Sequence, residues 1–307
     1  MSHILVIGAN GQLARALAER AGHRALRCVG RPGIDFDAPD GLPATLDGVL
    51  CGDPPALVVN AAAYTAVDRA ETEPEAAARS NHHGPAMLAA ACARAGIPFI
   101  HVSTDYVFDG LKGAPYVETD PTSPSGVYGA TKLAGEQAVL AACKQAMVLR
   151  TSWVYGAHGR NFVLTLLAAA ARTDTLRVVA DQFGCPTAAP ELALAILAVA
   201  DRLAATGWHA RYGGVFHAAG SGSTSWHGLA TALFDAAAAH GMTRPAIVPI
   251  TTAEWPTPVR RPPDSRLDCT RLAETFGVAL PHWQDSLPCI VDQVFAARPL
   301  TADARTR

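Results

Sequence analysis

The chain has 307 residues, of which 50% are hydrophobic, with a net charge of −2 and a pI near 6.6. These values allow one large α/β domain or a domain with a sizeable addition, and the lack of a basic block argues against a nucleic-acid partner. Seven scattered cysteines without a CxxC pair argue against a disulfide framework or a zinc site. With no basic leader and no run of about 18 apolar residues, the sequence predicts a cytoplasmic protein and no membrane span.

Strand and helix patterns alternate from the first residues. Apolar runs predict strands over 4–8, 25–29, 56–59, 98–102 and 147–152, and helices are expected over 11–21, 74–95 and 126–143. This alternation predicts the α/β class and a Rossmann-type, doubly wound parallel sheet with right-handed crossovers. We expect a dinucleotide-binding domain over 1–155 and a smaller, mainly substrate-binding region over 156–300 that can return to the sheet.

The pattern is looser in the second half of the chain. Helices are expected over 161–172, 190–204 and 226–240, and short strands over 176–179 and 247–250. The proline-rich segment 255–264 is predicted to be an ordered loop.

The first predicted strand ends in a glycine turn, GANGQLA from Gly8 to Ala14. Glycines at such a turn let the backbone approach a pyrophosphate, and the following helix N-terminus offers free N–H groups. The spacing GxxGxxA, from Gly8 through Gly11, is tighter than the usual GxGxxG, and alanine at the third position still allows close helix–strand packing. An ordinary tight turn is the alternative.

Cofactor choice is expected to depend on the residues after the second strand, Val29-Gly30-Arg31-Pro32. No carboxylate is present there to hold the ribose 2′-OH of NAD, whereas Arg31 can pair with the 2′-phosphate of NADP. NADPH is therefore favoured over NADH, with a solvated surface arginine as the alternative. Asp35 and Asp37 follow and either contact the adenine side or start a turn.

The segment from Tyr128 to Lys132 carries the most specific chemical pattern. A spacing of four on a helix places these two side chains on one face, about 5–6 Å apart at Cβ. A free tyrosine has a pKa near 10, and an adjacent ammonium lowers that pKa toward the range of useful proton transfer. The alternative is an exposed helix pair, because YxxxK is common by chance.

A hydroxyl at the end of the fourth strand would complete a catalytic group. Ser103 and Thr104 stand there, and the carboxyl ends of strands are where open α/β sheets bind ligands. Either hydroxyl can hold a substrate carbonyl against the tyrosine. The alternative for each is capping of the turn that follows.

Eight ordered blocks make the chain resemble the extended short-chain dehydrogenase/reductases and, within them, the dTDP-4-dehydrorhamnose reductase family. The resemblance covers nearly the whole chain. The blocks are GANGQLA from residue 8, NAAAYTAVDRAE from 60, STDYVFDG from 103, YGATK from 128, RTSWVYG from 150, NFV from 161, DQFGCPT from 181 and RPPDSRLD from 261.

The resemblance implies roles for the matching residues. Thr104 is implied to be the catalytic hydroxyl, Tyr128 the proton donor and Lys132 its partner. The sugar nucleotide is implied to contact Thr104, Asp105 and Trp153, although Trp153 can also be a core residue. The residues implied to line the cofactor, together with Gly8, Arg31, Tyr128 and Lys132, are Asn10, Gly11, Gln12, Leu13, Asp35, Phe36, Ala61, Ala62, Ala63 and Tyr64.

The substrate diphosphate needs cations, and arginine offers bidentate geometry for this task. Arg261 is the first choice because it opens the RPPDSRLD block. The full set of candidates is Lys144, Arg150, Arg160, Arg172, Arg260, Arg261 and Arg266.

Some members of the family bind Mg²⁺ through carboxylates at a dimer interface, so a homodimer is one expectation. Arg15 stands where an acid of the first helix could have served beside Glu191, so the sequence does not favour Mg²⁺. The adjacent His82 and His83 are unusual in this family and do not share a helix face. We therefore predict no metal site.

The implied reaction is NAD(P)H-dependent reduction of the C4 ketone of dTDP-4-dehydro-6-deoxy-L-mannose to dTDP-L-rhamnose. The alternatives are a nucleotide-sugar epimerase or dehydratase of the same fold, or a non-catalytic dinucleotide-binding regulatory subunit. A dehydratase commonly carries Asp-Glu after its catalytic threonine, whereas Thr104 is followed by Asp105-Tyr106. Because a pure binder need not keep Thr104, Tyr128 and Lys132, an enzyme is favoured.

Overall fold

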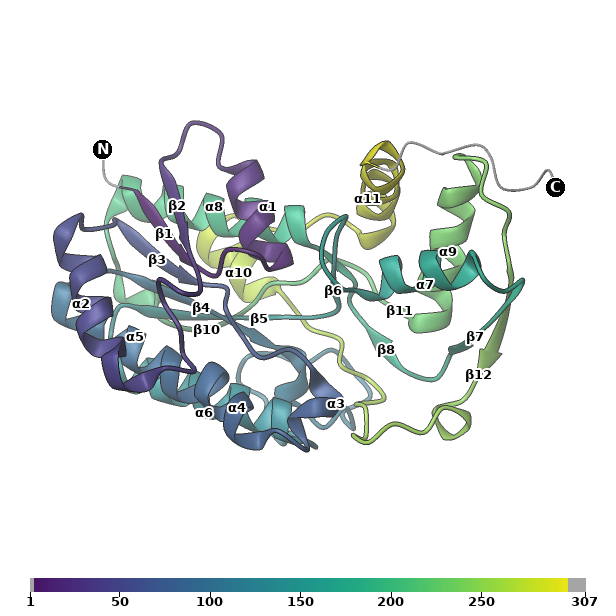
Figure 1. The fold of residues 1–307 in the computed structure, drawn as a ribbon, viewed down its shortest axis with the longest axis horizontal. Coiled ribbons are helices and arrows are strands. Elements are labelled where there is room, and N and C mark those ends of the chain that lie inside the picture. Colours follow the sequence, from purple (N-terminus) through teal and green to yellow (C-terminus); the bar gives the residue numbers. More distant parts are fainter. Residues whose placement is uncertain (1–2, 298–307) are drawn as a thin grey trace.

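The computed structural model describes residues 3–297. Figure 1 shows a larger lobe built around a parallel sheet and a smaller lobe that contains α7 (Phe162–Ala170), α9 (Trp226–Ala238), β7 (Thr175–Val179) and β12 (Ala246–Ile250). No helix among the described residues is both long and apolar enough to span a membrane.

The larger lobe contains a six-stranded sheet in the order β10-β5-β4-β3-β1-β2, with every neighbouring pair parallel. The α/β fold class with a Rossmann-type parallel sheet is thereby confirmed. Its strands are β1 (Ile4–Ile7), β2 (Leu26–Val29), β3 (Leu57–Asn60), β4 (Phe99–Thr104), β5 (Ala146–Thr151) and β10 (Gly214–His217). The order reverses between β1 and β3, the place where such sheets bind ligands beyond the carboxyl ends of the strands.

Helices cover both faces of this sheet because its strands are apolar on both sides. In β1, Val6 packs with one core cluster and Leu5 and Ile7 with the other. The first cluster includes α1 (Gln12–Arg20), α8 (Ala189–Thr206) and α10 (Thr270–Phe276), and the second includes α2 (Leu42–Gly52), α5 (Gly84–Ala95) and α6 (Val127–Ala142).

The predicted helix over 74–95 is interrupted in its middle. It consists of α4 (Pro74–Ala78), a π-helical turn (Arg79–His83) and α5, and the short α3 (Val67–Ala70) precedes it. Asn81, inside the π-helical turn, donates from its amide to the Thr131 hydroxyl of α6 and to the Tyr64 carbonyl. The wider turn therefore faces the helix that carries the predicted catalytic pair.

The second half of the chain contributes to both lobes. The smaller lobe adds α11 (Trp283–Ala297) and has a core of its own. Three short pairs complete the strands, β7 with β12, β6 (Val154–Tyr155) with β9 (Thr187–Ala188), and β8 (Phe183–Gly184) with β11 (Thr224–Ser225). Because α8, β10 and α10 lie with the main sheet, the chain does return to it, and the division at residue 155 stays a prediction.

Candidate active site

A cleft of about 1250 Å³ lies beyond the carboxyl ends of β1, β3, β4 and β5. Its other wall comes from α7, β7 and the proline-rich segment 255–264. Thirteen of the predicted site residues line it and therefore meet in space, although they come from distant parts of the sequence. They are Asn10, Gly11, Gln12, Leu13, Ala61, Ala62, Ala63, Thr104, Asp105, Tyr128, Lys132, Trp153 and Arg261.

The glycine turn before α1 has the geometry of a phosphate loop. Gly8 has a φ of +114°, and a Cβ there would lie 3.3 Å from the Ala62 nitrogen, so β1 and β3 approach closely at this point. A Cβ on Gly11 would meet nothing within 4 Å, and no side chain caps the α1 N-terminus that Gly11 precedes. Free helix N–H groups beside open space fit a dinucleotide phosphate.

The predicted residues after β2 lie outside the lining of the cleft. The Arg31 side chain is 71% exposed and stands 3.3 Å from the Asp37 carboxylate. Asp35 accepts a hydrogen bond from the backbone nitrogen of Asp37, so it forms the turn that was the alternative for it. Arg31 is thus an exposed cation paired with Asp37 just after β2, outside the lining of the cleft.

Phe36 and Tyr64 also lie outside the lining, because both have structural neighbours. Phe36 is 8% exposed and packs on α5 so closely that a Cβ at Gly84 would fall 2.3 Å from its ring. The Tyr64 hydroxyl donates to Glu73 at 2.5 Å, and its backbone nitrogen donates to the Asn81 side chain at 2.9 Å. Both residues thus fix the backbone that flanks the cleft.

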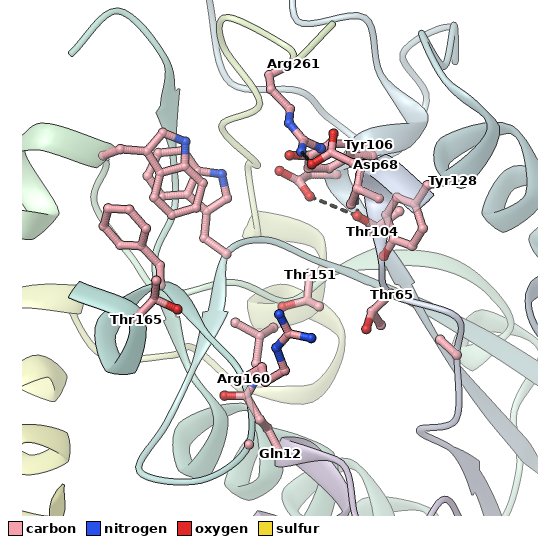
Figure 2. Close-up of a pocket in the computed structure, with 18 of the residues that line it drawn as sticks. Gln12, Thr65, Asp68, Thr104, Tyr106, Tyr128, Thr151, Arg160, Thr165 and Arg261 are labelled. Carbon is pink, nitrogen blue, oxygen red and sulfur yellow. Dashed lines mark hydrogen bonds and ion pairs between the residues drawn. The ribbon is translucent and has the colours of Figure 1, made fainter. Parts of the chain in front are cut away.

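Thr104, Tyr128 and Lys132 meet on the wall formed by β4 and α6. The side chains of Tyr128 and Thr104 lie together in Figure 2, and both line the cleft. Lys132 is 2% exposed, and its ammonium donates to the carbonyl of Val102 at 2.6 Å. Burial raises the pKa of Tyr128 and lowers the pKa of Lys132 to about 8. A nearby cation would draw the phenol pKa back toward neutrality.

Asp105 is a buried carboxyl group next to the catalytic wall. It is 2% exposed and accepts hydrogen bonds from Thr104 and Ser152, both at 3.0 Å. Burial raises its pKa to about 6, against the lowering effect of these hydroxyl donors and of Ser265. It fixes the Thr104 hydroxyl, and it can accept a hydrogen bond from a ligand in the cleft.

Stacked aromatic side chains form the opposite part of the cleft. The rings of Trp153 and Trp226 stack at 3.4 Å and 5°, and Phe162 lies 4.6 Å from the Trp226 ring. Trp153 has a φ of +47°, an uncommon conformation for a bulky residue. A Cβ on Gly184 would fall 2.4 Å from the Trp153 ring. The absence of a side chain on Gly184 therefore makes room for the indole.

Sequence reasoning missed Trp226 and Gly184 as parts of this site. Neither is near Trp153 in sequence, and only the packing of β8 and α9 brings them together. Gly184 does lie in the DQFGCPT block, which is the one signal that could have drawn attention to it. Trp255 also lines the cleft, with 54% of its surface exposed.

Arg261 lines the cleft in an ion pair. Its guanidinium lies 2.6 Å from Asp68 and 5.9 Å from the centre of the Tyr106 ring (Figure 2). Tyr106 in turn meets the Tyr128 ring edge-on at 5.6 Å. The segment that carries Arg261 thus contacts the wall that holds Tyr128, the predicted proton donor.

The remaining candidate cations differ in whether they line the cleft. Arg150 is buried in a pair with Glu136, so it does not reach the cleft. Arg160 lines the cleft and makes no ion pair within residues 3–297, and Arg177 on β7 lines it beside Glu254. Of the other candidates, Lys144, Arg172, Arg260 and Arg266 are absent from the lining. Over the part of the chain that the structure describes, no three His, Cys, Asp or Glu side chains are grouped to hold a metal ion.

Comparisons with known proteins agree with this geometry. The family model described as the RmlD substrate binding domain matches residues 1–295. The chain is 43% identical to a dTDP-4-dehydrorhamnose reductase of Sinorhizobium fredii, over 92% of this chain and 94% of that protein. It is 45% identical to the corresponding protein of Burkholderia thailandensis, over 92% and 95%. The chain belongs to the dTDP-4-dehydrorhamnose reductase family.

Solved structures of the family have the same fold. A dTDP-4-dehydrorhamnose reductase of Clostridium acetobutylicum superposes with a TM-score of 0.86 at 34% identity, covering 95% of this chain and 99% of that one. The Bacillus anthracis protein, crystallised with NADP, gives 0.85 at 29% identity, over 95% and 100%. A UDP-glucose 4-epimerase of Thermus thermophilus with NAD gives 0.73 at 20% identity, which shows the shared fold alone.

Proposed function

We propose that this protein reduces the C4 ketone of dTDP-4-dehydro-6-deoxy-L-mannose to dTDP-L-rhamnose, with NADPH as the reductant. The observation that carries the proposal is the meeting of Thr104, Tyr128 and Lys132 in a cleft that also contains a phosphate loop. Membership of the dTDP-4-dehydrorhamnose reductase family supports the choice of reaction and substrate. The NADP in the Bacillus anthracis relative supports the cofactor.

The phosphate loop would hold the cofactor diphosphate at Gly11 and the N-terminus of α1, with Ala61, Ala62 and Ala63 along its length. Arg31 is exposed and would meet a 2′-phosphate. When bound, the reduced nicotinamide supplies a hydride for the C4 carbon. The chain itself has to hold the ketone, exclude water and deliver a proton.

Tyr128 would donate its phenolic proton to the C4 oxygen as negative charge develops there. The Thr104 hydroxyl, which donates to Asp105 in the structure, would turn its proton to the same oxygen and steady it by a hydrogen bond. Lys132 would stabilise the phenolate that remains, because its ammonium lies one helical turn further along α6. Asp105 holds Thr104 in place and would accept a hydrogen bond from a hydroxyl of the sugar.

The aromatic wall would bind the rest of the substrate. Trp153, stacked on Trp226, presents a flat apolar face on which a sugar ring can pack. Arg261, and with it Arg160, would face the diphosphate, since both line the cleft and arginine binds such groups bidentately.

The test is an assay in which the ketosugar is generated from dTDP-glucose by the upstream dehydratase and epimerase. Enzyme-dependent loss of NADPH absorbance, with one dTDP-L-rhamnose formed per NADPH, is the expected result. The same assay with NADH, and with Arg31→Ala, measures what Arg31 contributes. Cofactor binding without oxidation of either nicotinamide would sink the proposal and favour a regulatory subunit.

A further inference from the structure

A second cluster of buried charged groups lies behind the catalytic wall. Glu136 is 2% exposed and Arg150 3% exposed. The guanidinium of Arg150 donates to both carboxylate oxygens of Glu136, at 2.7 Å from Nη2 and 3.0 Å from Nε. Burying an ion pair is costly, and a pair of apolar side chains would often be as stable. Such a pair therefore invites a functional explanation.

The carboxylate lies next to the catalytic residues. Glu136 follows Lys132 by four residues on α6, so the two side chains share a face of the helix. Ser103 donates its hydroxyl to Glu136, while Lys132 donates to the carbonyl of Val102, the preceding residue of β4. Thr104 comes next on the same strand. Two consecutive residues of β4 thus anchor the carboxylate and the ammonium.

Few other charges act on Lys132. Among residues 3–297, Glu136 is the only charged group that raises the pKa of Lys132 against the effect of burial. Burial, and then the charge of Lys132, lower the pKa of His101 on β4 far enough to keep it neutral, and Asp105 and Tyr106 in the turn after β4 act on Tyr128. In the described part of the chain, α3, α4, α5 and the π-helical turn contribute no group that shifts the pKa of Lys132 or Tyr128.

We propose that Glu136 is a positioning residue, whose buried carboxylate is the counter-charge that keeps the Lys132 ammonium protonated beside Tyr128. Arg150 and Ser103 hold that carboxylate at a fixed place, from β5 and β4. The consequence for turnover rests on the proposed function, because it assumes that Tyr128 and Lys132 act in a reduction. The charge state of Lys132 can be measured without it.

The chain offers an unusually clean measurement, because it contains only three lysines, Lys112, Lys132 and Lys144. Protein labelled with ¹³C-lysine gives three side-chain signals, which Lys112→Arg and Lys144→Arg variants assign. We expect Glu136→Gln to lower the pH at which Lys132 loses its proton by about one unit, because an opposite charge has been removed nearby. Ser103→Ala keeps the carboxylate and removes one hydrogen bond, so it should leave the titration nearly unchanged.

A double variant separates this electrostatic role from a structural one. Glu136→Gln leaves Arg150 buried without a partner and can weaken the fold, whereas Glu136→Gln with Arg150→Gln removes both charges. If the carboxylate acts on Lys132, the titration point is lowest in Glu136→Gln and only partly lowered in the double variant, which also lacks the positive charge of Arg150. If Glu136 only holds the fold together, Lys132 in a folded Glu136→Gln protein titrates as in the wild type, and that result overturns the proposal.

The kinetic consequence is a pH profile. With ketosugar and NADPH, the alkaline limb of kcat should move to lower pH by about one unit in Glu136→Gln, which is about a five-fold loss at pH 8 and little change at pH 6, and by less in the double variant. A wild-type protein that binds NADPH and turns over no ketosugar would contradict the proposed function. The lysine titration would still decide the role of Glu136.

Discussion

The two walls of the cleft are built in different ways. On the side of the sheet, Thr104, Asp105 and Lys132 are at most 5% exposed and bonded to neighbours at the ends of strands. On the other side, stacked indoles line the cleft and Trp255 is 54% exposed. The sheet thus holds in fixed positions the groups to which we assign proton transfer, and the other wall supplies the apolar faces to which we assign recognition of the substrate.

The largest effect is expected from the sheet wall, the side of the cleft that carries Thr104, Tyr128 and Lys132. Tyr128→Phe removes the phenolic proton while leaving the ring, so kcat should fall by about a thousand-fold. Binding of NADPH, measured by fluorescence titration, should stay within about two-fold of wild type. Substantial turnover in this variant would exclude Tyr128 as the proton donor.

The pH dependence of unfolding tests how much the buried Asp105 carboxylate lowers the stability of the folded protein. Its folded-state pKa of about 6 lies above the ordinary value near 3.9, so the native state binds the proton more tightly than the unfolded state. The free energy of unfolding of the wild type should therefore fall, by about 2 kcal/mol through this group, as the pH rises from 4 to 8.

In Asp105→Asn this group no longer titrates. The free energy of unfolding, measured with urea across this pH range, should therefore fall less in the variant than in the wild type. Equal pH dependence of the two proteins would mean that Asp105 is not destabilised by burial. Ser152→Ala, which removes one hydroxyl donor to the carboxylate, is a matched control that retains the titration.

The aromatic wall is tested through Gly184. In Gly184→Ala the new methyl group would fall 2.4 Å from the Trp153 ring, so the indole must move off Trp226. We expect KM for the sugar nucleotide to rise about ten-fold while kcat changes less, because the catalytic wall is untouched. Gly48→Ala, where a Cβ meets nothing within 4 Å, should match wild type. A loss confined to kcat would contradict the division between the walls.

The smallest effect is expected where the walls meet. Asp68→Asn removes a negative charge beside the Arg261 guanidinium, in a partly exposed ion pair worth up to about 1 kcal/mol. An anionic diphosphate should then bind more tightly, with KM lower by two- to five-fold at low salt and less at high salt. Arg261→Gln should raise KM, and a rise in both variants would show that the pair matters for structure alone.

The sheet wall was the more predictable one from sequence. The spacing of Tyr128 and Lys132 and the position of Thr104 at a strand end rest on local rules, and the structure brings all three together. Their catalytic roles stay predictions. The doubly wound sheet could be predicted from the sequence equally well, because alternating strands and helices leave a strong periodic pattern.

The parts of the site that could not be predicted depend on contacts between segments that are far apart in the sequence. The residues near Trp153 in the sequence give no indication that its ring stacks on Trp226. In the same way, the sequence does not show that Arg150 is paired with Glu136, because only the fold brings the two together. Two elements, β10 and α11, were missed for a different reason. The strand β10 has four residues and begins with glycine, while α11 contains Pro288 in its interior, so neither gives a clear pattern.

The π-helical turn within 74–95 amounts to one residue more than a regular helix would use. Each residue of an α-helix advances by about 100°, so the extra residue rotates all of α5 relative to α4. The Asn81 carbonyl also lies against Gly135, where an added Cβ would be only 2.0 Å away. Removing one residue from this turn would make a better helix and turn Asn81 away from α6. In this segment chain length is as tightly constrained as residue identity, and a single-codon deletion should be harder to tolerate than most substitutions.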